Sequence, residues 1–135
     1  MRRDLPAAIL LISCLLSPSL SADEKLESEV AYLLEFVADS GCDFVRNGSS
    51  HEPEAAADHL RLKYSRGKRY VGSAEQFIDR LASESSWTGK PYSVTCDGQS
   101  EPAGAWLHRA LDTYRANAAS AGLPVTTTLP AHRSS

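Results

Sequence analysis

The pattern of apolar residues along the chain predicts four helices. Between residues 23 and 40, apolar side chains recur every three or four positions, which is the spacing of one helix face. Stripes of the same kind predict a second helix over 53–64, a third after Ser73 and a fourth over 102–122. Ser73 also suits the start of a helix, because Gln76 follows it at the spacing of a capping box.

Two shorter segments between these helices alternate apolar and polar residues, as β-strands do. They cover residues 42–46 and 92–96, and each ends at a dipeptide typical of turns, Asn47-Gly48 and Asp97-Gly98. The predicted fold is therefore mainly α with a small β-ribbon, in the α+β class. It has about four helices and two short strands in one compact domain.

Residues 1–22 have the composition of a bacterial export signal. Two arginines precede an apolar run from Leu5 to Leu16, which is too short to span a hydrocarbon core about 30 Å thick. Small residues follow, so cleavage is expected at or near Ala22. The predicted mature chain is a single globular domain over 23–122, followed by a tail over 123–135 that lacks periodicity and is expected to be disordered.

This leader predicts a periplasmic or secreted protein without a transmembrane segment, since no second apolar run follows. The alternative is a lipid anchor, because Leu11-Ile12-Ser13-Cys14 resembles the lipobox of bacterial lipoproteins. The two leucines directly after Cys14 weigh against that alternative, because lipoproteins normally have a polar tether there.

The net charge bears on the possible partners, and the cysteine content bears on a disulfide. With 14 basic and 17 acidic residues, the chain has no overall attraction for nucleic acid, and no nucleic-acid partner is expected. Loss of the leader would leave two cysteines, Cys42 and Cys96. An oxidising compartment favours a disulfide between them, with two buried free thiols as the alternative. A disulfide would bring the two predicted strands side by side or nearly so.

Five short segments spread over residues 25–115 carry a family resemblance. They are Phe44-Val45-Arg46-Asn47-Gly48; Glu54-Ala55 with His59-Leu60 and Lys63; Ala74-Glu75-Gln76-Phe77-Ile78-Asp79; Ala82-Ser83 with Ser85-Ser86, Thr88-Gly89-Lys90-Pro91-Tyr92 and Val94; and Trp106-Leu107. Through them the chain resembles the YfeK-like family, small bacterial periplasmic proteins that form a domain of unknown function. The resemblance implies export and a shared fold, and it implies no activity.

Polar residues inside these segments are the candidates for a binding site. Arg46, Asn47 and Lys90 flank the predicted ribbon, and His59 and Lys63 lie on the second helix. We expect these five residues to form a polar corner that binds a ligand. The alternative is a structural role, with Arg46 and Lys90 in salt bridges and Asn47 in the turn.

The densest basic segment, residues 61–70, is expected to be a solvated surface. Anionic envelope polymers or lipid headgroups are its alternative partners. No cofactor or metal is expected. His51 and His59 lie two helical turns apart, too far to share one ion unless the loop before the helix folds back.

The leading hypothesis is a non-enzymatic binding or interaction module of the cell envelope, with an envelope protein or an anionic envelope ligand as its partner. The alternative is a small envelope hydrolase in which Ser85 or Ser86 acts with His59. The chain lacks the G-x-S-x-G turn that presents a nucleophilic serine in many hydrolases, which favours the first hypothesis.

Overall fold

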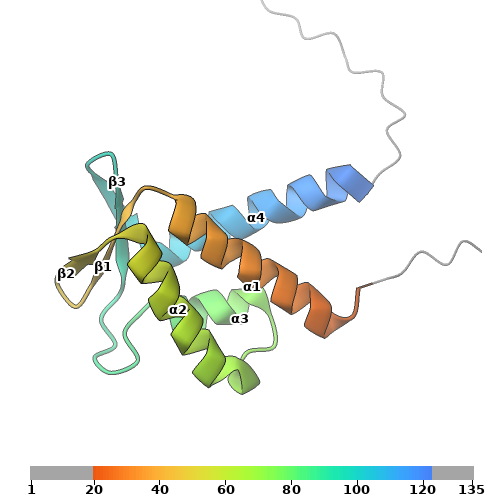
Figure 1. Ribbon diagram of the computed structural model, residues 1–135, viewed down its shortest axis with the longest axis horizontal. Coiled ribbons are helices and arrows are strands. Elements are labelled where there is room, and N and C mark those ends of the chain that lie inside the picture. Colours follow the sequence, from red (N-terminus) through yellow and green to blue (C-terminus); the bar gives the residue numbers. More distant parts are fainter. Residues whose placement is uncertain (1–19, 123–135) are drawn as a thin grey trace, which may run out of the picture.

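The computed structural model describes residues 20–122, in which helices pack against one side of a four-stranded sheet (Figure 1). Residues 1–19 of the predicted leader, including Cys14, and the predicted tail over 123–135 lie outside the described residues. Within the described part of the chain, no helix combines the length and the apolar character needed to cross a membrane.

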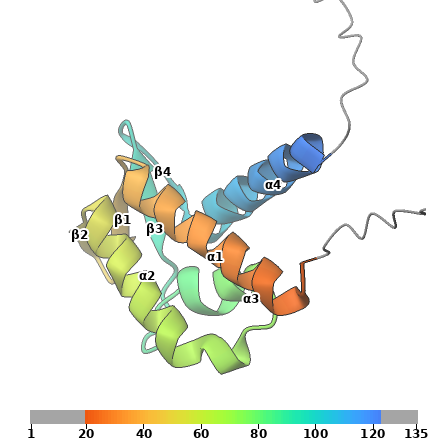
Figure 2. The same cartoon turned by 45° about the vertical axis from the view of Figure 1, so that its right-hand side comes forward.

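The four predicted helices are confirmed. They are α1 (Ala22–Asp39), α2 (Pro53–Gly67), α3 (Ala74–Phe77) and α4 (Ala103–Gly122). A 3-10 turn over Lys68–Tyr70 follows α2, and a π-helical turn over Ile78–Ala82 extends α3. Figures 1 and 2 both show α3 between α1 and α2, whereas the C-terminal end of α4 projects away from the body.

The start of α3 differs in one bond from the predicted capping box. Ser73 Oγ accepts a hydrogen bond from the Gln76 backbone N–H at 3.2 Å, as expected of an N-cap. The Gln76 side chain, however, accepts from the backbone N–H of Gly72 at 2.8 Å, and not from Ser73. The glutamine thus fixes the loop that leads into the helix.

The prediction of two strands is wrong, because the sheet has four. They are β1 (Asp43–Arg46), β2 (Ser49–His51), β3 (Ser93–Cys96) and β4 (Gln99–Pro102), in the order β2-β1-β3-β4 with every neighbouring pair antiparallel. The two missed strands are short, polar edge strands. Each is joined to its inner neighbour by one of the turn dipeptides, whose residues all have positive φ, from 49° to 79°. Such turns match the twist of a hairpin and return the chain along the previous strand.

The sheet is built from two similar units, each a hairpin followed by a helix. Asn47 (φ 49°) corresponds to Asp97 (φ 50°), and α2 follows β2 as α4 follows β4. The inner strands pair symmetrically about Phe44 and Val94, which lie opposite each other. Both side chains are fully buried, so they fix the inner strands against the helical layer.

The two ends of this inner strand pair are closed in different ways. Continuing the register by one residue at one end places Cys42 opposite Cys96, and these residues form a disulfide with a Cα–Cα distance of 4.6 Å. The predicted pairing is therefore confirmed. At the other end the same register places Arg46 opposite Tyr92.

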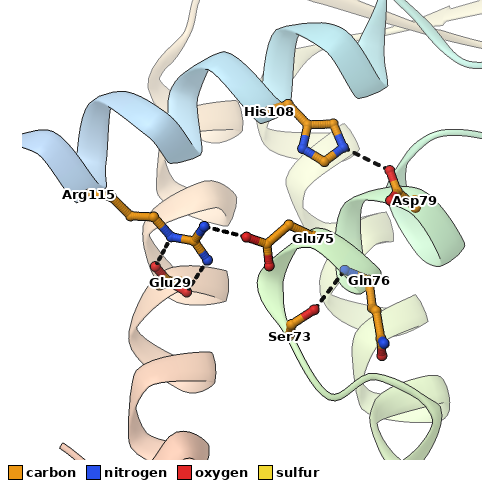
Figure 3. A network of polar contacts seen from close by, with 7 residues as sticks. All are labelled: Glu29, Ser73, Glu75, Gln76, Asp79, His108 and Arg115. Carbon is orange, nitrogen blue, oxygen red and sulfur yellow. Dashed lines mark hydrogen bonds and ion pairs between the residues drawn. The ribbon is translucent and has the colours of Figure 1, made fainter.

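A charged network attaches α4 to the other helices (Figure 3). Glu29 of α1 is only 4% exposed. Arg115 of α4 binds it with two hydrogen bonds, from Nε to Oε2 at 2.6 Å and from Nη2 to Oε1 at 2.9 Å. The Arg115 Nη1 also contacts Glu75 of α3, and this bond lowers the pKa of Glu75 to about 2. One guanidinium thus joins three helices.

Candidate functional site

A pocket of about 510 Å³ lies beside α2, at the end of the inner strands that lacks the disulfide. It is lined by Arg46, Asn47, His59, Leu62, Lys63, Arg66, Gly67, Leu81, Ser85, Ser86, Trp87 and Tyr92. These residues come from the end of β1, from α2, from the π-helical turn and from the loop before β3. His59, Leu62, Lys63 and Arg66 recur at the spacing of a single helix face.

The lining carries a strong positive charge. Arg46, Lys63 and Arg66 are all part of it, and no Asp or Glu within residues 20–122 is. Lys63 Nζ donates to the Tyr92 hydroxyl at 3.2 Å and to the backbone carbonyl of Glu84 at 3.0 Å. Burial, and secondarily the charge of Arg46, lower the pKa of Lys63 to about 8. The charge of Glu84 acts on this pKa in the opposite direction without reversing the shift, so the ammonium group in the pocket is only partly compensated.

Arg46 and His59 form the polar centre of the site. The Arg46 Nη1 lies 2.9 Å from His59 Nε2. A guanidinium group can only donate, so this histidine nitrogen is the acceptor and the ring is neutral, with its proton on Nδ1. Burial, followed by the charges of Arg46 and Lys63, lowers the pKa of His59 to about 4, which agrees with that assignment. The Arg46 Nε is buried and has no hydrogen-bond partner among the described residues.

The loop before β3 is fixed to the β1–β2 turn. Thr88 Oγ1 donates to the Asn47 side-chain carbonyl at 2.8 Å. Ser85 Oγ accepts from the backbone N–H groups of Trp87 and Thr88, both at 3.3 Å. Ser85 is 5% exposed, so its hydroxyl serves mainly to close this loop.

Four of the five predicted site residues line the same pocket: Arg46, Asn47, His59 and Lys63. Lys90 does not line it. Its backbone carbonyl accepts from Ser85 N–H and its backbone N–H donates to Thr88 Oγ1, so Lys90 closes the loop. Asn47 occupies the turn as the structural alternative proposed, whereas Arg46 and Lys90 form no salt bridge within the described part of the chain.

Several residues of the pocket were not predicted as site residues. The sequence predicts Tyr92 only as part of a strand and Arg66 only as part of a basic surface. None of the three apolar lining residues, Leu62, Leu81 and Trp87, is predicted to belong to a site. The spacing of Leu62 and Arg66 relative to His59 was the available signal, since it puts all three on one face of α2.

The two serines that line the pocket are not hydrogen-bonded to its histidine in the described part of the chain. Within residues 20–122, neither Ser85 nor Ser86 forms a hydrogen bond with His59, whose Nε2 is already bound by Arg46. The lining also supplies no carboxylate that could orient the imidazole as a general base. The geometry therefore gives the hydrolase hypothesis no support.

The chain belongs to the family described as "Family of unknown function (DUF5329)", whose model matches residues 24–115. It is also similar to the protein described as "Uncharacterized protein YfeK" of Salmonella typhimurium strain LT2, with 57% identity over 49 residues. That match covers 36% of this chain and 41% of the relative, so it spans less than half of either protein. No solved structure matches the chain. The expected YfeK-like family is confirmed.

Proposed function

We propose that this protein is an exported, non-enzymatic module of the cell envelope that binds an oxyanion in the pocket beside α2. The observation that carries the proposal is that three cationic side chains line the pocket, whereas no carboxylate of residues 20–122 does. Arg46 contributes a guanidinium, a group that binds carboxylates and phosphates through parallel hydrogen bonds. An anionic envelope component is the ligand that this chemistry favours.

Binding of inorganic phosphate tests the proposal directly. In a nuclear magnetic resonance titration, phosphate should shift the signals of residues that line the pocket. Arg46→Gln should weaken the affinity by about tenfold or more, because a charge-assisted hydrogen bond contributes roughly 1.5–3 kcal/mol. Arg109→Gln is the matched control, since Arg109 lies on α4, pairs with Glu101 and does not line the pocket. Equal losses in the two variants would contradict the proposal.

The pH dependence of the same titration supplies a second measurement, with sulfate as the probe because its charge is constant above neutral pH. An anion stabilises protonated Lys63, whose pKa is about 8 in the free protein. Affinity should therefore be highest below about pH 8 and fall as the pH rises further. Lys63→Gln should remove this decline, whereas a decline that persists in the variant would assign it to another group.

Export is supported by the leader pattern over residues 1–22 and by the disulfide between Cys42 and Cys96. We expect the protein recovered from a periplasmic fraction to have lost its leader at or near Ala22. Its intact mass should also be about 2 Da below that of the reduced form. Measurement of the intact mass with and without reductant checks both points. A product that begins at Met1 with every cysteine free to react would contradict them.

A further inference from the structure

We infer that the natural ligand is an amphiphile, in which an oxyanion headgroup carries an apolar chain. This inference rests on the proposed anion site and specifies the class of its ligand. It follows from the apolar side chains of Leu62, Leu81 and Trp87, which line the same pocket as Arg46 and Lys63. A simple inorganic anion would leave this apolar surface in water.

Trp87 is the most exposed large apolar residue of the described chain, at 97%. It does not lie on a loose loop, because its own backbone N–H and that of Thr88 both donate to Ser85 Oγ. The loop is also tied to the β1–β2 turn by the bond from Thr88 to Asn47. The fold therefore fixes the backbone of Trp87 beside the pocket and leaves its indole in water, where a ligand can cover it. Single exposed apolar residues are common, but this one shares a pocket with Leu62, which is 45% exposed.

Leu81 contributes to the apolar side because of its neighbour Gly67. A Cβ atom at position 67 would lie 3.1 Å from Leu81 Cδ2, closer than ordinary contact. The glycine thus leaves room for the Leu81 side chain where the end of α2 meets the π-helical turn. Two leucines and an indole consequently adjoin three cations in one pocket.

The size of the pocket also favours a ligand larger than a bare anion. A volume of about 510 Å³ lies in the range of small-molecule sites, roughly 300–1,000 Å³. A water molecule takes up roughly 30 Å³ in the liquid, so a phosphate group would fill only a small part of the space. The remaining volume suits an alkyl or acyl chain that lies against the apolar lining.

A homologous series of alkyl phosphates, from methyl to octyl and below their micelle concentrations, tests the inference on the full mature protein by isothermal titration calorimetry. Affinity should rise roughly threefold to fourfold for each added methylene until the apolar lining is covered. The tryptophan emission should shift to shorter wavelength at the same time, because Trp87 is exposed whereas Trp106 is already buried. Alkyl carboxylates of equal chain length are measured in parallel. The headgroup class for which Arg46→Gln lowers the affinity more is the class that this arginine recognises.

Trp87→Ala should reduce the gain per methylene. Tyr70→Ala should leave it unchanged, because Tyr70 is an exposed aromatic residue that does not line the pocket. An affinity that stays flat along the series, while phosphate binding and its dependence on Arg46 persist, would overturn the amphiphile and leave the anion site intact. Absence of binding by phosphate and by every alkyl phosphate would overturn both. Retention by vesicles that contain phosphatidic acid, lost in Arg46→Gln, would identify a membrane lipid as the source of the amphiphile.

Discussion

Replacement of both Cys42 and Cys96 by alanine is expected to lower the free energy of unfolding by about 4 kcal/mol, because the bond closes a long loop and restricts the unfolded chain. The two residues are separated by 54 positions in the sequence. Such a loss is large against a total stability of roughly 5–15 kcal/mol for a domain of this size. Urea denaturation of the oxidised protein and of the double variant, followed by circular dichroism, measures the difference.

Reduction of the natural protein supplies the control for this variant. Dithiothreitol should move its urea midpoint to that of the double variant, and it should leave the variant itself unchanged. The pocket lies at the opposite end of the inner strands, so phosphate binding should persist in the variant under conditions where it is folded. Equal midpoints for the oxidised protein and the double variant would contradict the stabilising role of the disulfide.

Arg115→Met is expected to cost about 3 kcal/mol, because removal of one partner leaves a buried charge without compensation. The remaining charge is that of Glu29, whose side chain is 5% exposed. Thermal and urea unfolding near pH 7 should show the loss. Arg109→Met is the matched control on the same helix, and it should cost less than about 1 kcal/mol since the pair with Glu101 is exposed.

A double-mutant cycle separates the ion pair from simple packing. Glu29→Gln combined with Arg115→Met should recover part of the stability, because the double variant no longer buries an unpaired carboxylate. Additive losses in the cycle would show that the guanidinium gains no stability from Glu29.

The Glu75 contact adds a pH dependence to the stability of the protein. The folded pKa of Glu75, about 2, lies below the usual 4.5, so its contribution is present above about pH 4.5 and is lost as the pH falls toward 2.

The helices could be predicted because their information is local. The apolar stripe of α1 and the serine before α3 specify those elements within a few turns, and the structure confirms both. The strands β2 and β4 could not be predicted in the same way. Ser49-Ser50-His51 contains no apolar residue, so its strand conformation comes from pairing with β1. The two turn dipeptides predict turns, but the sequence does not show that each turn joins two paired strands.

The sequence predicted only the polar and charged side of the pocket. Arg46, Asn47, His59 and Lys63 lie in segments that a family resemblance picked out, and the fold brings them together. The apolar half depends on where three unrelated segments meet, and Trp87 lies in a loop without periodicity. The charged network on α4 was missed for the same reason, although Glu29 on the apolar face of α1 was a signal of a buried partner.

By itself, the sequence determined the helices and the two inner strands, because each depends on neighbouring residues. It favoured a disulfide because only two cysteines follow the predicted leader, and its short segments of resemblance indicated the family. The tertiary structure alone decided the two edge strands, the apolar side of the pocket and the joining of three helices by Arg115. These features arise from contacts between residues that lie far apart in the chain. Such contacts are made by packing, and no local pattern encodes them.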